Sequence, residues 1–276
     1  MAITAADVNK LRQITGSGMM DCKNALVETD GDFDMAIDVL RKKGQKVAAK
    51  RADRNANEGF VVAKSTDDNT YGAVIMLNCE TDFVGKTADF IALANAIIDF
   101  AVANRILTID QLKQSNLKGQ SVEALLTEMT GKTGEKIELN QFAMMEKPFV
   151  SYYNHNGNRL ATIVGFSKKV DNLQIIGHEI AMQIAAMSPI SVSENDVPKD
   201  VIEHELEIAR ELVRNEGKPE NMVEKIAQGK LNKFFKESTL IHQDFIRDNK
   251  KTVAQYMAET DKELNCEGFY RLQLGV

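Results

Sequence analysis

Apolar residues recur at helical spacing through the first 55 positions of the chain. Val8 and Leu11 share one face of a first predicted helix, and Gly16 and Gly18 break the chain before a second apolar segment, MMDCKNALVE. After an Asp-Gly turn, a third helix follows, which Gly44 should end. The pattern predicts a three-helix unit and a basic helical linker within residues 1–55.

From Glu58 onward the apolar positions alternate, as in strands that bury one face. The segment GFVVAKSTDDNTYGAVIML returns 89 residues later as PFVSYYNHNGNRLATIVGF, with Phe60 matching Phe149. Each copy predicts a β-hairpin and an apolar helix, then a second helix and a third strand. We therefore expect an α+β fold whose core has two related subdomains, at residues 56–146 and 147–276, each an antiparallel sheet with helices on one face.

The two copies differ at the junction between the hairpin and the first helix. Aligning Ile91 with Ile175 changes the offset from 89 to 84, so the first copy is five residues longer there (89 − 84). The extra residues fall in NCETDFVGK, whereas the second copy has the plain SKKVDNL. Since the fold does not require an acidic and aromatic loop here, we interpret this loop as functional; its candidate residues are Thr81, Asp82, Phe83 and Val84.

The second copy contains an insertion at residues 192–236. Its segment VIEHELEIARELVRNEG is strongly amphipathic, and Gly217 and Pro219 end that helix and start another. Two antiparallel helices joined by a tight turn form an αα-hairpin. Two arrangements stay open: the hairpin projects and packs against a partner or a second copy of the chain, or it folds back onto its own core.

Charge and cysteine usage restrict the class of protein. A formal net charge of -6 argues against a chain that coats nucleic acid, and the only local basic candidate for RNA binding is Arg41–Arg54. No segment approaches the roughly 20 apolar residues that span a bilayer, and the start lacks a signal sequence. The three cysteines, Cys22, Cys79 and Cys266, have no CxxC spacing, so a reducing cytoplasm fits best.

The sequence contains no motif of a known catalytic site: GxxxxGK[ST], GxSxG and HExxH are all absent. A thiol-dependent enzyme would use Cys79, but the acidic Glu80 and Asp82 beside it oppose ionisation, which favours a buried structural thiol. We therefore expect neither an enzyme nor a bound metal or cofactor. Met19 and Met20 fit a helix core and an exposed partner-binding surface equally well.

Two segments together, LRQITGSGMMDCKNAL at residues 11–26 and NCETDFVGK at residues 78–86, resemble the translation elongation factor Ts (EF-Ts) family, the nucleotide exchange factors of EF-Tu. The resemblance extends through the chain and includes GEKI at residues 134–137. It implies an N-terminal domain like ubiquitin-associated domains, no bond-making chemistry, and EF-Tu as the partner.

The resemblance also implies residue roles. Asp82 and Phe83 would intrude beside the magnesium site of EF-Tu bound to GDP and promote GDP release, because a carboxylate and an aromatic ring disturb groups around a divalent cation. Arg12, Met19 and Met20 would hold the GTPase domain of the partner. The second subdomain would contact another part of EF-Tu.

The chain departs from the family pattern at two places. Many relatives have a histidine where this chain has Gln183, and many continue into a further C-terminal helix, whereas this sequence stops at Val276. A homodimer through the 192–236 hairpin stays open. The alternative function is an RNA-binding translation accessory protein that uses Arg41–Arg54.

Overall fold

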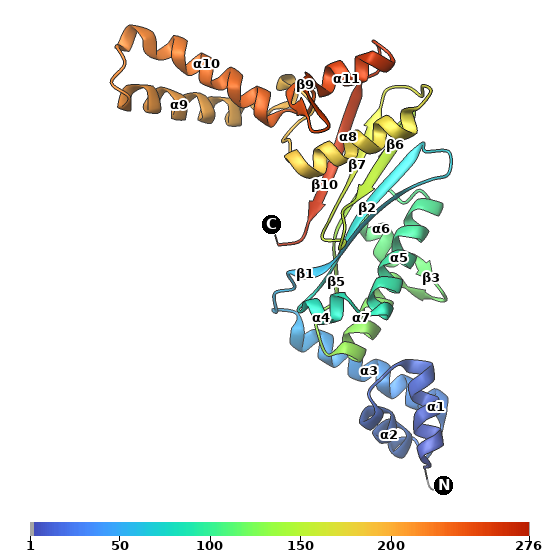
Figure 1. The fold of residues 1–276 in the computed structure, drawn as a ribbon. Helices are drawn as coiled ribbons and strands as arrows, with labels where there is room; N and C mark the ends of the chain where they lie inside the picture. Colours follow the sequence, from blue (N-terminus) through green and yellow to red (C-terminus); the bar gives the residue numbers. More distant parts are fainter. Residues whose placement is uncertain (1–2, 276) are drawn as a thin grey trace.

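The structure is a computed structural model that describes residues 3–275, and it begins with a bundle of three helices (Figure 1). Thr4 and Asp7 cap the first helix reciprocally, and Asp32 caps the third through the Met35 amide at 2.9 Å. Val8, Leu11, Cys22, Leu26 and Ala36 fill the bundle. The helices are α1 (Ala5–Thr15), α2 (Met19–Glu28) and α3 (Phe33–Arg51).

The prediction that Gly44 ends the third helix is wrong, because α3 continues through it for seven more residues. Gly44 lies at the crossing of α3 with α7 (Val122–Thr133), where a Cβ on Gly131 would be only 2.7 Å from the Cα of Gly44. These two glycines allow the helix backbones to approach closely, so α3 belongs to both the bundle and the core. Because one helix is shared by the bundle and the core, the predicted division into residues 1–55, 56–146 and 147–276 stays a proposal.

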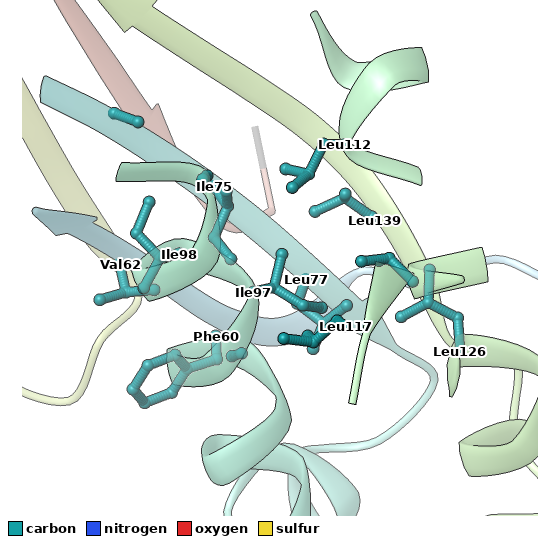
Figure 2. Close-up of a cluster of buried hydrophobic side chains, with 14 of the residues drawn as sticks. Phe60, Val62, Ile75, Leu77, Ile97, Ile98, Leu112, Leu117, Leu126 and Leu139 are labelled. Carbon is teal, nitrogen blue, oxygen red and sulfur yellow. The ribbon is translucent and has the colours of Figure 1, made fainter. Parts of the chain in front are cut away.

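The first sheet has the order β1-β2-β5, with antiparallel neighbours. One face is covered by helices, and Figure 2 shows how side chains of the three strands meet those of α5 in a single buried cluster. The strands are β1 (Glu58–Ser65), β2 (Tyr71–Cys79) and β5 (Glu138–Glu146); the intervening elements are α4 (Asp82–Gly85), α5 (Ala88–Ala103), α6 (Ile109–Gln114), β3 (Asn116–Leu117), β4 (Gln120–Ser121) and α7.

The second sheet repeats this arrangement in the order β6-β7-β10, again with the second strand of the hairpin in the centre. The predicted α+β class with two related sheet-and-helix units is confirmed. The elements are β6 (Phe149–Asn154), β7 (Leu160–Phe166), α8 (Leu173–Met187), β8 (Asp244–Phe245), β9 (Asp248–Thr252), α11 (Val253–Thr260) and β10 (Cys266–Gln273).

The faces of the two sheets that carry no helices pack against each other. Val61, Val74 and Met76 of the first sheet share a buried cluster with Val150 and Ile163 of the second. Every residue of β2 and β7 is consequently buried, since each strand has a helix layer on one face and the other sheet on the opposite face. The sequence predicted both sheets but not this stacking.

The inserted segment forms the predicted αα-hairpin, from α9 (Lys199–Asn215) and α10 (Glu220–Ser238). Gly217, at φ +71°, turns the chain between them. The hairpin extends away from the two sheets (Figure 1), so the arrangement folded back onto the core is not the one observed. The two helices bury a seam between them that contains Ala209, Val213, Val223, Ala227 and Leu231.

Among residues 3–275 no helix combines the length and apolar character that crossing a membrane requires. Three short elements complete the fold: the 3-10 turns Glu194–Asp196 and Leu240–His242, and an isolated bridge between Ser191 and Thr239. The position of Val276, after which many relatives continue into a further helix, lies outside the described residues.

Candidate partner-binding site

The TDFV segment, interpreted as a loop from the sequence, forms most of a single helical turn, α4 (Asp82–Gly85), and its N-cap. Thr81 is its N-cap, and the Thr81 Oγ1 accepts a hydrogen bond from the Val84 amide at 3.4 Å. The turn separates its side chains by direction: Val84 packs against the core of the first sheet, whereas Phe83 leaves 82% of its surface exposed. Local hydrogen bonding by Thr81 favours the turn, which the apolar pattern alone does not reveal.

The length difference between the copies is distributed over several elements. The connection from β2 to α5 has eight residues, 80–87, and that from β7 to α8 has six, 167–172, which leaves two extra residues in the connection itself (8 − 6). The other three come from a β2 that runs two residues further and from a helix α8 that begins one position later than its counterpart. The five-residue extension is therefore only partly a loop.

The turn is seated directly on the strands beneath it. A Cβ on Gly85 would lie 3.4 Å from both the Cys79 Sγ and the Gly59 carbonyl oxygen, which is ordinary van der Waals contact, so the turn lies directly against both strands. Gly59 itself adopts φ +149°, and a Cβ on it would be 2.0 Å from the Leu77 carbonyl oxygen. Gly59 thus lets β1 lie close to β2 beneath the turn.

Asp82 is ionised and faces outward beside Phe83. Its carboxylate accepts a hydrogen bond from the Lys86 ammonium at 2.6 Å, one helical turn later, and 47% of the Asp82 side chain is exposed. This hydrogen bond, with the charge of Lys86, holds the pKa of Asp82 below its usual value. The turn therefore presents an aromatic ring and a carboxylate together.

The N-terminal bundle exposes its own apolar side chains. Met19 and Met20, which the sequence left between core and surface, are 51% and 63% exposed, and Arg12 is exposed as well. Ile14, at the end of α1, adds a further exposed apolar side chain at 56%. Cys22 and Leu26 occupy the core positions of α2 instead, so both methionines are available to a partner.

The structure does not place the bundle residues beside the TDFV turn. α1 and α2 lie at one end of the molecule, and α4 lies near the far end of α3 (Figure 1). Lys43 of α3 pairs with Asp21 near the start of α2, and Arg51 of α3 pairs with Glu80 beside the TDFV turn. The two positions are eight residues apart on α3 (51 − 43), or about 12 Å along its axis. The candidate residues therefore form two separate contact regions, joined by one continuous helix that packs on the core.

Cys79 has the environment of a packing residue. It is fully buried, and its thiol donates to the Thr81 carbonyl oxygen at 3.1 Å. Burial, together with the nearby carboxylates of Glu135 and Glu58, raises the pKa of the Cys79 thiol to about 12. A neutral, buried thiol is a poor nucleophile, so the arrangement does not favour thiol chemistry.

The basic segment Arg41–Arg54 lies mostly on α3, and part of its charge is already compensated. Lys43 pairs with Asp21, and the Arg51 guanidinium pairs with Glu80 at 2.8 Å. Paired cations contribute less to phosphate binding than free ones. No observation therefore favours the RNA-binding alternative over protein binding.

Gln183 is a buried structural residue and not a surface contact. Its Oε1 accepts from the Ile246 amide at 2.8 Å, and its Nε2 donates to the Gln243 side chain and the Asp244 carbonyl oxygen, both at 3.2 Å. It joins α8 to the segment around β8. The amide thus satisfies both a donor and two acceptors inside the second subdomain.

Sequence reasoning missed Glu135, which binds the TDFV turn from beneath. Its carboxylate accepts from the Thr81 amide at 3.0 Å and from the Thr81 Oγ1 at 2.6 Å. Glu135 is 54 residues away in the chain, so no local pattern could reveal the contact. The only signal was the GEKI segment, which belonged to the family resemblance without a role.

Exposed apolar side chains on two separate elements are typical of proteins that act by binding a partner. Among residues 3–275, moreover, no three His, Cys, Asp or Glu side chains gather where they could hold a metal ion.

Comparison with known proteins identifies the family. A family model described as Elongation factor TS matches residues 80–276. The chain is 52% identical to the elongation factor Ts of Christiangramia forsetii and 50% identical to that of Flavobacterium psychrophilum, with 99% of each chain covered. It is 49% identical to the elongation factor Ts of Amoebophilus asiaticus over the full length of both. The chain belongs to the elongation factor Ts family and is a translation elongation factor.

Proposed function

We propose that this protein is a guanine-nucleotide exchange factor that binds EF-Tu in its GDP-bound form and promotes GDP release. The observation that carries the proposal is the exposure of Phe83 on a turn that is otherwise packed and hydrogen-bonded. A folded protein gains nothing by holding a phenylalanine in water, whereas a partner can bury it. Family membership gives EF-Tu as that partner.

The proposed mechanism is a displacement of groups in the partner. Phe83 enters beside the magnesium site of EF-Tu, and the ionised Asp82 next to it competes for the groups that surround the cation. Thr81 and Val84 hold the turn while its two outer side chains act. GDP, whose phosphates lose the support of the magnesium ion, then dissociates. No bond is made or broken, so the protein is not an enzyme in the chemical sense.

Thermodynamic linkage sets a requirement on the interface. GDP and the exchange factor must weaken each other's binding by the same free energy, and each tenfold of weakening corresponds to about 1.4 kcal/mol. Several such increments need a broad contact. The separation of Met19 and Met20 from the TDFV turn supports a broad contact, because the two regions can bind the partner at different places while α3 connects them.

The experiment that tests the proposal is release of a fluorescent GDP analogue from EF-Tu, chased with excess unlabelled GDP. The native protein should accelerate release, and the double variant Asp82→Ala/Phe83→Ala should accelerate it little. No acceleration by the folded native protein would refute the proposal.

The methionines have a different expected effect. Met19→Ser/Met20→Ser should raise the concentration needed for half-maximal acceleration by about tenfold, because two exposed apolar contacts are lost. Val27→Ser is the matched control, since Val27 is also exposed on α2, at 57%, but lies at the opposite end of the helix. An equal effect of both variants would contradict a specific role for Met19 and Met20.

The αα-hairpin is proposed to carry a homodimer contact. Ile208 and Leu212, one helical turn apart on α9, remain 38% and 48% exposed after the hairpin has formed its own seam. Ile208→Glu/Leu212→Glu should convert a dimer to a monomer in sedimentation velocity, with Glu211→Gln as the control. A native protein that sediments as a monomer at all concentrations would refute this contact.

We further propose that the protein works in the cytoplasm, where translation takes place, and that it does not bind nucleic acid directly. The net charge of -6 supports this second point. Binding of labelled RNA that falls steeply with salt would contradict it and would revive the Arg41–Arg54 alternative.

A further inference from the structure

The TDFV turn cannot hold itself in place. α4 has four residues, and helices much longer than this are only marginally stable in water without tertiary contacts. The direction in which Phe83 leaves the surface must therefore be fixed by groups outside the turn. Gly85 and Val84 seat its C-terminal half against the first sheet. Its N-terminal half depends on hydrogen bonds.

Those hydrogen bonds come from a reciprocal arrangement of two carboxylates. The Glu135 carboxylate accepts from the amide and the hydroxyl of Thr81, at 3.0 and 2.6 Å. In return, the Glu80 carboxylate accepts from the Lys136 amide at 2.7 Å. Each of the two segments, 80–81 and 135–136, thus supplies one carboxylate to the main chain of the other. We refer to Glu80, Thr81, Glu135 and Lys136 as the carboxylate clasp.

The clasp is partly shielded from water, and the Arg51 guanidinium pairs with one of its two carboxylates, that of Glu80. The Glu80 side chain is only 16% exposed, and both its oxygens lie within 3.1 Å of the Arg51 Nη1. Hydrogen bonds to ionised groups are stronger than those between neutral groups, and they set direction as well as energy. Arg51 is also the last residue of α3, so the helix that reaches from the N-terminal bundle ends on the clasp.

We propose that Glu135 is a positioning residue for Phe83. Glu135 fixes Thr81 and, through the cap that Thr81 makes to Val84, the whole turn. An aromatic side chain presented by a rigid turn loses less conformational freedom when a partner buries it. This inference rests on the proposed exchange function, and it assigns a role to a residue that need not touch the partner.

The proposal separates two kinetic quantities. Affinity for the partner rests on the whole interface, including the distant bundle. The rate of GDP release within the complex rests on Phe83 being held in the right direction. Loss of the clasp should therefore lower the release rate at saturating protein and leave the half-saturating concentration nearly unchanged.

A direct measurement of the turn uses the fact that the chain has no tryptophan. In a Phe83→Trp background, time-resolved fluorescence anisotropy reports nanosecond motion of this one side chain. Glu135→Ala should increase the amplitude of that motion, and Thr81→Val should do the same, since it keeps the shape of threonine and removes its hydroxyl. Thr81→Ser should restore the native amplitude. Glu138→Gln is the control, because Glu138 pairs with the side-chain Nζ of Lys136 at 3.1 Å, whereas the clasp uses only the Lys136 backbone amide.

The same substitutions in the native background are then tested for GDP release from EF-Tu. Glu135→Ala and Thr81→Val should lower the saturating release rate by about tenfold, as expected for loss of charge-assisted hydrogen bonds, with half-saturation within about twofold of native. Thr81→Ser and Glu138→Gln should behave like the native protein.

The outcomes distinguish the two proposals. Native protein that fails to accelerate release refutes the exchange function, and the anisotropy alone then decides whether the clasp positions the turn. Acceleration by native protein, with Glu135→Ala and Thr81→Val matching Glu138→Gln in both assays, overturns the role of Glu135. If Glu135→Ala does not fold, the comparison of Thr81→Val with Thr81→Ser gives the same decision.

Discussion

Two phenylalanines seven positions apart provide a quantitative test of which side chains serve the fold. Phe90, in α5, is fully buried, and its truncation to alanine should cost about 3–5 kcal/mol of unfolding free energy. Phe83 is 82% exposed, so only 18% of its surface is buried (100 − 82). Full burial of such a side chain is worth about 1.5–3 kcal/mol, and a fifth of this is roughly 0.3–0.6 kcal/mol. Phe83→Ala should therefore leave stability almost unchanged.

Urea unfolding followed by far-ultraviolet circular dichroism measures both variants against the native protein. Phe90→Ala should lower the midpoint clearly, and Phe83→Ala should shift it little, with the slope of the transition unchanged. A loss of more than about 1.5 kcal/mol for Phe83→Ala would show that its ring holds the fold together. Phe83 would then not be free for a partner, and the reasoning from its exposure would fail.

Three further predictions concern helix glycines, a buried side-chain amide and a buried thiol. Gly131→Ala places a Cβ 2.7 Å from the Cα of Gly44 and should lower the thermal midpoint, with a cost of about 1–3 kcal/mol, whereas Gly229→Ala, in open space on α10, should stabilise the protein by up to about 1 kcal/mol. Gln183→Leu leaves the Ile246 amide without its acceptor and should cost about 1–3 kcal/mol in denaturant unfolding. The pKa of the Cys79 thiol is raised from 9.0 to about 12 in the folded protein, so the unfolded state loses this proton first as pH rises. The free energy of unfolding should therefore fall between pH 9 and pH 12, and it should fall less steeply in Cys79→Ala.

Periodicity predicted the parts of the fold that local chemistry determines. Alternating apolar residues located both hairpins, and their 89-residue offset predicted two related sheets. The structure adds that the two sheets share the same strand order. Local side chains also cap the helices, for example Asp32 at the start of α3. Gly44 was misread, because a glycine that ends a helix and one that lets two helices approach look identical in sequence. Only the distant Gly131 distinguishes them.

For the candidate site, the sequence indicated a segment but not its conformation or its supports. The comparison of the two copies singled out the segment around Phe83, but its helical turn and its seat on Gly59 depend on contacts between distant segments. Glu135 was missed for the same reason, since its partner Thr81 lies 54 residues earlier in the chain. The stacking of the two sheets was also beyond local pattern: the continuous burial of β2 shows that both of its faces are covered but does not say by what.

The central claim is that the protein stabilises EF-Tu without nucleotide at the expense of EF-Tu with GDP. The most direct measurement is the dissociation constant of the protein for each of these two forms, together with that of Asp82→Ala/Phe83→Ala. The native protein should bind the nucleotide-free form far more tightly, and the variant should show a much smaller ratio of the two constants. Equal affinity of the native protein for both forms would contradict the account, because a ligand that does not distinguish two states cannot shift the balance between them.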